Sequence, residues 1–193
     1  MKERTNSRVE KTEYVLEHRQ PTLTVIIANI ANEHNVSAIY RTCDAFGVMD
    51  IHLYYTHTPF PKISRTTSAS SSKWVHTHKH DSPASIREAL PNFQILSTQC
   101  SPQARPLREY SYTQPTAILF GNEHDGVDKE LLPYTDGEVY IPMYGMVQSF
   151  NVSVAAAIVL YECVRQREDS GMYTTRQLSE EAFSHYKEEW LKK

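Results

Sequence analysis

The sequence predicts an α/β fold, a mainly parallel sheet with helices on both faces. Short apolar, β-branched runs such as Leu23–Ile27 and Thr116–Phe120 are typical of strands that are buried on both sides. These runs alternate along the chain with capped or amphipathic helical segments, which is the pattern of parallel βαβ units. A length of 193 residues suits one such domain with additions at its ends.

Helix-breaking and helix-capping residues set the bounds of the elements in the first half of the chain. Pro21 stops the first helix, Gly47 closes the second, and Asn35 or Ser37 can cap the start of that second helix. The stretch 59–72, rich in Pro, Ser and Thr, is expected to be an exposed loop. The elements expected here are a helix over Ser7–Arg19, a strand over Leu23–Ile27, a helix up to Phe46, and strands over Ile51–Tyr55 and Trp74–Thr77.

The second half continues the alternation. Asp81 or Ser82 can cap one helix, and Ser149, Asn151 or Ser153 can cap a long apolar one. The turn-forming segment Gly121–Gly126 follows a strand directly. The elements expected here are strands over Phe93–Thr98, Thr116–Phe120 and Val139–Ile141, and helices up to Leu90, over Val127–Tyr134, over Asn151–Arg167 and over Thr175–Leu191.

Composition indicates a soluble protein, expected in the cytoplasm. Mean hydropathy is -0.52, and no apolar run approaches the roughly 20 residues that cross a bilayer. The charged N-terminus shows no secretion signal. Cys43, Cys100 and Cys163 are odd in number and far apart, which disfavours disulfides and zinc sites, so they are expected to be core residues.

Charge is segregated along the chain although the net charge is only -3. No acidic residue lies between Asp50 and Asp81, a span that holds four Lys or Arg and five His, whereas residues 109–138 carry seven Asp or Glu against one lysine. RNA or another polyanion could meet the basic span. A solvated loop with chance asymmetry is the alternative.

His76, His78 and His80 alternate as they would on one face of a strand, and such a cluster can bind a metal. A surface strand is favoured over a metal site, because no carboxylate or cysteine lies nearby in the sequence to complete one.

Three segments combine turn residues with polar side chains at expected strand ends, where open parallel sheets bind ligands. They are residues 35–47, 119–126 and 141–162. In the last segment a loop leads to a helix N-terminus, whose free N–H groups suit a carboxylate or phosphate. An ordinary strand-to-helix connection is the alternative. The glycines match neither the dinucleotide fingerprint nor the phosphate loop, which disfavours nicotinamide and ATP enzymes.

Together these segments resemble the motifs of the SpoU/TrmH family of knotted RNA ribose methyltransferases, in the SPOUT class. The first motif is matched by Asn35 and Arg41–Thr42, and the second by Gly121, Glu123 and Gly126. The third is matched by residues 141–143 and 149–153. The stretches VLEHRQPTLTV and TSASSSKWVH and the tail after YECVRQRE resemble the tRNA guanosine-2′-O-methyltransferase branch, so the resemblance covers nearly the whole chain.

The resemblance implies a C-terminal deep trefoil knot, an exception to the usual avoidance of knots, and a homodimer. It divides the chain into an N-terminal helical extension (1–20), a methyltransferase domain (21–168) and a C-terminal helical extension (169–193). S-adenosylmethionine would bind in the knot, and the family often has Leu where this chain has Phe150. The residues implied to contact this cofactor are Thr98, Gly121, Ile141, Met146, Ser149 and Phe150.

The resemblance also implies roles in catalysis, without a metal. Arg41 would activate the ribose 2′-hydroxyl, and because a guanidinium is always protonated, the destination of the proton stays open. Asn35 would orient the ribose or Arg41, Glu123 would fix the motif loops, and Ser149 and Asn151 would organise the site. For RNA phosphates, the basic residues available are Arg4, Arg8, Lys11, Arg19, Arg65 and Lys73.

The expected activity is therefore 2′-O-methylation of a tRNA ribose, at guanosine 18 of the D-loop. Ribosomal RNA or the tRNA wobble nucleotide are alternative substrates, although the wobble enzymes resemble the knot domain without terminal helices. A non-catalytic protein that binds and folds tRNA is an alternative of another class. The intact Asn35, Arg41, Glu123, Ser149 and Asn151 disfavour it.

Overall fold

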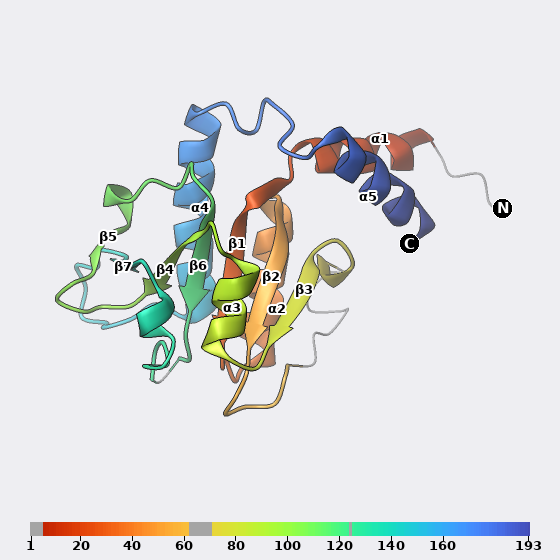
Figure 1. Cartoon of the computed structure of the whole chain (residues 1–193). Helices are drawn as coiled ribbons and strands as arrows, with labels where there is room; N and C mark the ends of the chain where they lie inside the picture. The colour runs from red at the N-terminus through yellow and green to blue at the C-terminus, as the bar shows by residue number, and fades with distance from the viewer. Residues whose placement is uncertain (1–5, 62–70, 124) are drawn as a thin grey trace.

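The computed structural model of the protein describes residues 6–61, 71–123 and 125–193 (Figure 1). Its strands form one seven-stranded sheet in the order β3-β2-β1-β6-β4-β7-β5, and every neighbouring pair is parallel. The predicted parallel sheet is therefore confirmed. The strands are β1 (Gln20–Ala28), β2 (Val48–Tyr54), β3 (His76–His80), β4 (Gln94–Thr98), β5 (Arg105–Pro106), β6 (Thr116–Phe120) and β7 (Gly137–Tyr140).

Helices cover both faces of the sheet, as predicted, and two more pack together beside it (Figure 1). The α-helices are α1 (Asn6–Glu17), α2 (Glu33–Ala45), α3 (Pro83–Ala89), α4 (Val152–Asp169) and α5 (Glu180–Lys192). Short 3-10 turns lie at η1 (Ser71–Lys73), η2 (Leu107–Glu109) and η3 (Leu132–Tyr134).

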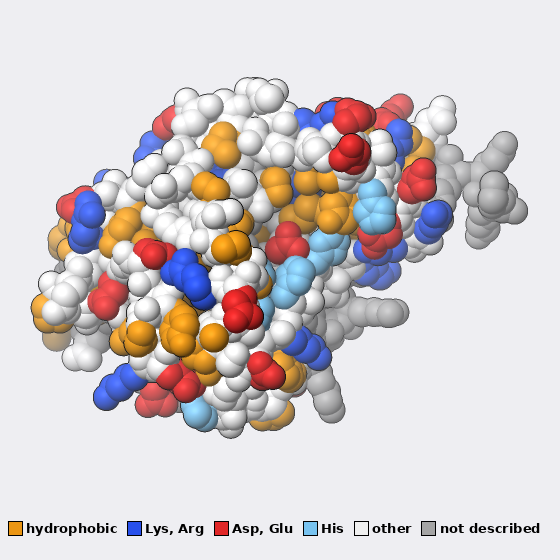
Figure 2. Space-filling view, in the orientation of Figure 1, with side chains coloured by type: hydrophobic (Ala, Val, Ile, Leu, Met, Phe, Trp, Pro, Cys, Tyr) orange, Lys and Arg blue, Asp and Glu red, His pale blue; other side chains and the backbone are white. Residues whose placement is uncertain are grey.

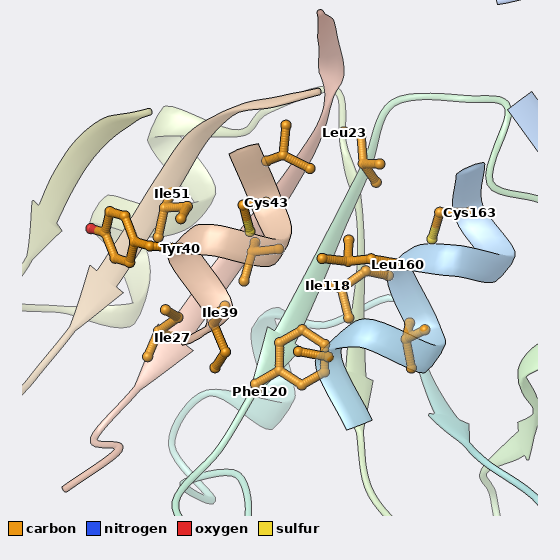
Figure 3. Close-up of a cluster of buried hydrophobic side chains, with 14 of the residues drawn as sticks. Leu23, Ile27, Ile39, Tyr40, Cys43, Ile51, Ile118, Phe120, Leu160 and Cys163 are labelled. Atoms are coloured by element: carbon orange, nitrogen blue, oxygen red, sulfur yellow. The ribbon is translucent and has the colours of Figure 1, made fainter. Parts of the chain in front are cut away.

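The strand β1 is buried on both sides because its apolar residues serve two cores. Leu23, Val25 and Ile27 pack with α2 and α4 in a cluster that Figure 3 shows from close by. Ile26 and Ala28 point to the opposite face and pack with α3. The strand β6 divides its side chains in the same way. This double burial explains the nearly continuous apolar runs in the sequence.

The terminal helices α1 and α5 share a third core at one end of the sheet. Leu16 of α1 packs with Met49 of β2 and with Phe183 and Trp190 of α5. Lys187 of α5 also pairs with Glu13 of α1 at 2.5 Å. The apolar side of the C-terminal helix therefore covers this core.

Buried Arg167 ties the end of α4 to the start of β1. Its side chain is 0% exposed, and its five N–H groups donate to five uncharged oxygens. Two of these belong to Thr22, whose carbonyl accepts at 2.8 Å and whose hydroxyl accepts at 3.0 Å. Full pairing is what makes burial of a charge tolerable.

The start of α2 differs from the prediction. Asn32 caps this helix by accepting a hydrogen bond from the His34 amide at 2.9 Å. Asn35 and Ser37, the predicted caps, lie inside the helix and are buried. The side chain of Asn35 is therefore available for another contact.

The helix predicted over Val127–Tyr134 is wrong, since only the turn η3 forms there. Pro133 lacks an N–H and disfavours α-helical backbone angles at Leu132. An α-helix therefore does not run through this segment. The strand predicted to start at Trp74 starts at His76. Trp74 packs instead against Trp190, with ring centroids 5.1 Å apart.

Two of the three cysteines are core residues, as predicted. Cys43 and Cys163 are buried, whereas Cys100 is exposed just beyond β4. The prediction for Cys100 is therefore wrong, because the chain leaves the sheet two residues before it.

No helix within the described ranges is both long and apolar enough to span a membrane. The knot and the three-part division of the chain stay predictions.

A strip of histidines lies along β3, the edge strand, and continues onto β2 (Figure 2). The expected surface strand is confirmed, but the reason given against a metal site was wrong, because Asp50 of β2 lies 2.7 Å from His78 Nε2. Even so, no group of three or more His, Cys, Asp or Glu side chains in the described part of the chain could hold a metal ion.

His52 makes the stability of this strip dependent on pH. Its Nδ1 lies 2.8 Å from His80 Nε2, and burial, with His78 and His80 nearby, lowers the pKa of His52 from 6.5 to about 4. Between those pH values the unfolded chain takes up a proton that the folded chain does not. We therefore expect the free energy of unfolding to decrease as the pH falls through this window.

Urea unfolding at several pH values between 7 and 4 checks this expectation, with His52→Gln beside the wild type. The wild type should lose about 2 kcal/mol more than the variant across the window. Asp50 and His78 remain in both proteins. The raised pKa of His78, which Asp50 causes, therefore contributes equally to the pH dependence of stability in each. Parallel curves for the two proteins would contradict the assignment to His52.

Candidate active site

A chain of hydrogen bonds joins the three motif segments at the carboxyl ends of β1, β6 and β7. Asn35 Nδ2 donates to Glu123 Oε1 at 2.8 Å, and Asn35 Oδ1 accepts from Asn151 Nδ2 at 3.1 Å. Asn151 Oδ1 accepts in turn from the amide of Ser153 at 2.9 Å. Three segments far apart in the sequence are thus held together by the side-chain amide of Asn35.

The local structure explains why these side chains meet. Asn35 lies in the first turn of α2, and Asn151, one of the three capping residues that the sequence offers, is the N-cap of α4. The two helices pack side by side on one face of the sheet. Asn151 can therefore cap its own helix through Oδ1 and reach Asn35 through Nδ2.

Glu123 sits in a tight turn that requires glycine at two positions. Asn122 and Gly126 exchange backbone hydrogen bonds of 2.8 and 3.0 Å across the turn. A Cβ on Gly121 would lie 2.1 Å from the Gly126 carbonyl oxygen, and Gly126 itself has a φ of +73°. Both glycines in this motif are therefore explained by the backbone.

A cavity of about 680 Å³ lies between the ends of β4, β6 and β7 and the start of α4. This volume is in the range of sites for small molecules and cofactors. Glu123 and Asp125 give the lining negative charge, and Val139 and Val159 give it apolar surface. Of the predicted cofactor residues, those that line the cavity are Thr98, Gly121, Ile141, Ser149 and Phe150.

Met146, the remaining predicted cofactor residue, does not line the cavity. It lies in the loop before α4 and is 100% exposed. Its assignment stays a prediction.

Arg41 is exposed on α2, on the same helix as Asn35. Within the described ranges its guanidinium makes no hydrogen bond or ion pair. An exposed, unpaired guanidinium six residues after Asn35 on the same helix is able to bind a polar or anionic group of a substrate.

The predicted RNA-binding residues divide into three groups. Arg8, Lys11 and Lys73 are exposed, and Arg65, like Arg4, lies outside the described residues. The prediction that Arg19 binds RNA is wrong, because its side chain is 0% exposed.

Arg19 is buried because α1 leads straight into β1 at this residue. Its guanidinium donates to the Val48 carbonyl at 2.9 Å, pairs with Asp44 at 2.6 Å and lies 5.0 Å from the centre of the Trp190 ring. Burial lowers the pKa of Arg19, and Asp44 opposes that shift. This arginine joins α1, α2 and α5 and does not face solvent.

Sequence reasoning missed Asn29, which follows β1. It is 2% exposed and is the only non-glycine residue of the described chain with a positive φ, at 49°. Asparagine is one of the few residues that tolerate this conformation. An asparagine directly after an apolar strand was the signal available in the sequence.

Comparison with known proteins shows similarity over most of the chain. The model of the SpoU rRNA Methylase family matches residues 22–161. The chain is 44% identical over 197 residues to tRNA (guanosine(18)-2′-O)-methyltransferase of Thermus thermophilus, with 100% of both chains covered.

Two solved structures are similar to the model. A crystal structure of the TrmH/SpoU tRNA modifying enzyme of A. aeolicus has a TM-score of 0.89 at 44% identity, covering 95% of this chain and 94% of that one. The SpoU methyltransferase AviRb from Streptomyces viridochromogenes, in complex with AdoMet, has a TM-score of 0.68 at 24% identity. That match covers 79% of this chain and 59% of the other, and it shows a shared fold.

Proposed function

This chain belongs to the SpoU rRNA methylase family, and we propose that within it the protein methylates the ribose 2′-hydroxyl of guanosine 18 in tRNA. The methyl donor is S-adenosylmethionine. Identity of 44% over the full length to a curated enzyme with this activity supports the choice of substrate. The observation that carries the activity is the hydrogen-bonded chain Glu123–Asn35–Asn151, whose Glu123 and Asn151 also line the cavity.

The cavity beside this chain fits the cofactor. Its volume of about 680 Å³ is ample for a nucleoside joined to an amino acid. The apolar lining, Ile141 and Phe150 among it, suits an adenine ring, and the carboxylates of Glu123 and Asp125 suit a cationic ligand. When bound, S-adenosylmethionine supplies a methyl group activated by a positively charged sulfur.

The residues of the chain then position and activate the hydroxyl. Arg41 binds the ribose hydroxyl or a neighbouring phosphate, and it orients the oxygen without accepting its proton. Asn35 is held in one orientation because Glu123 and Asn151 occupy the two ends of its amide. This fixed geometry supplies most of what a direct transfer requires.

We propose that exposed basic residues outside the cavity bind the tRNA. We also propose that the protein acts in the cytoplasm. Arg8 and Lys11 of α1 and Lys73 of η1 meet phosphates, which orient the RNA without reading its sequence. Residues 21–168 carry out the reaction in this proposal, and the extensions 1–20 and 169–193 contribute to binding.

The protein is also proposed to act as a homodimer. The large exposed apolar side chains of α4 and of the loop before it, here called the α4 face, are Tyr144, Met146, Val147, Phe150, Val154 and Tyr161, which are between 38% and 100% exposed. Exposed apolar side chains that gather on one segment mark interaction sites. The α4 face adjoins the candidate active site, and a second copy of the chain is the partner that would cover it in every molecule.

Methyl transfer from labelled S-adenosylmethionine to an unmodified tRNA transcript tests the proposed activity. Label is expected on the ribose of guanosine 18, and Arg41→Ala should lower kcat about a hundredfold or more because the hydroxyl is no longer oriented. Arg8→Ala should instead raise the KM for tRNA with little change in kcat.

Mapping the labelled nucleotide separates the alternatives. Label on a ribosomal RNA fragment or on the wobble nucleotide would keep the chemistry and reject the substrate. Tight tRNA binding without any transfer would favour the non-catalytic alternative. Arg108→Ala, at an exposed arginine of η2, is the control that should match the wild type.

Cys100 offers a test of the cofactor site that does not depend on activity. This exposed thiol lines the cavity, whereas Cys43 and Cys163 are buried and burial raises the pKa of each. S-adenosylmethionine at about ten times its Kd should slow alkylation of Cys100 about tenfold. Mass spectrometry after timed N-ethylmaleimide treatment measures the rate, and Cys100→Ser shows the background. An unchanged rate at saturating cofactor would contradict this location.

Sedimentation velocity tests the dimer. Tyr161→Lys places a charge on the α4 face and should convert the dimer into a monomer. Tyr14→Lys is the matched control, because Tyr14 of α1 is 63% exposed and Tyr161 is 61% exposed. A wild type that sediments as a monomer at micromolar concentration would reject the proposal.

A further inference from the structure

We propose that Asn29 is a positioning residue for the methyl transfer, because it fixes the loop after β6 against the loop after β2. This inference rests on the proposed function for the reaction that it affects. Asn29 does not line the cavity and is argued to act through Glu123 and Asn35.

The backbone of Asn29 reaches both loops. Its amide donates to the Tyr54 carbonyl at the end of β2, at 2.9 Å. Its carbonyl accepts from Asn122 Nδ2 in the loop after β6, at 2.7 Å. The positive φ turns the chain sharply at the end of β1, and an asparagine adopts it at low cost.

The side chain makes the same bridge a second time. Asn29 Oδ1 accepts from the amides of Thr56 and His57 at 2.9 and 3.2 Å. Asn29 Nδ2 donates to Asp128 Oδ2 at 2.8 Å. With the residue only 2% exposed, no water replaces these bonds cheaply if one is lost.

The contacts continue to the active site. Asn122 and Asp128 flank the turn in which Asn122 and Gly126 exchange backbone hydrogen bonds. Glu123 lies within that turn and accepts from Asn35. A displacement of Asn122 and Asp128 therefore moves the carboxylate that orients Asn35, although no residue of the cavity itself has changed.

Asn29→Asp separates the two sides of the bridge. The oxygen that accepts from Thr56 and His57 is kept, and a carboxylate replaces the group that donates to Asp128, so two like charges face each other. We expect kcat per cofactor-binding site to fall about tenfold or more, with the KM for tRNA within about threefold of wild type.

Adding Asp128→Asn restores one donor and one acceptor with the direction of the bond reversed. This double variant should recover kcat to within about threefold of wild type. Asn92→Asp is the matched control, because Asn92 is exposed in the turn after α3 and the change in charge is identical. It should keep the wild-type kcat.

Hydrogen exchange gives a readout independent of catalysis. The amides of Asn122 and Gly126, which bond across the turn, should exchange faster in Asn29→Asp and return to the wild-type rate in the double variant.

A purely structural role would lower the fraction of protein that binds cofactor while kcat per binding site stays constant, and that result would overturn the proposal. So would unchanged exchange at the turn. If the wild type fails to methylate tRNA, the proposed function is rejected, and the exchange rates still decide whether Asn29 fixes the loop.

Discussion

The orientation of one side-chain amide, that of Asn35, is the constraint on which the site depends. An amide has a donor end and an acceptor end, and here Glu123 takes the first and Asn151 the second. The carboxylate of Glu123 can only accept hydrogen bonds, so Asn35 directs Nδ2 to Glu123 and is left with Oδ1 to accept from Asn151. Three loops with no sequence proximity are thereby given one relative arrangement.

Long-range supports hold this arrangement in place. Helix α4 is tied at its start by Asn151 and near its end by Arg167, so that it cannot slide along the sheet without breaking buried hydrogen bonds at both places. Helix α2 is held at its own end by the pair between Arg19 and Asp44. The polar chemistry at one edge of the sheet therefore relies on buried arginines at the other end of the same helices.

Much of this architecture could be read from the sequence, because apolar runs and caps report local structure directly. The strand Thr116–Phe120 is found as predicted, and α4 is capped by Asn151, one of the three capping residues that the sequence offers. Contacts between distant segments could not be read. Asp50 was counted as remote from the histidines of β3, yet strand pairing places it beside His76. Arg19 was predicted to be a surface cation because Asp44 and Trp190, which contact it in the fold, are distant from it in the sequence.

The uncharged surroundings of Arg167 contrast with the titrating groups around His52. The oxygens that receive the Arg167 donors belong to backbone carbonyls, a glutamine and a threonine, so their bonding is indifferent to acid. The hydrogen bonds of Arg167 therefore keep their strength in acid that protonates His52. As the pH falls towards 4, the contact between His52 of β2 and His80 of β3 should weaken while Arg167 still joins α4 to β1.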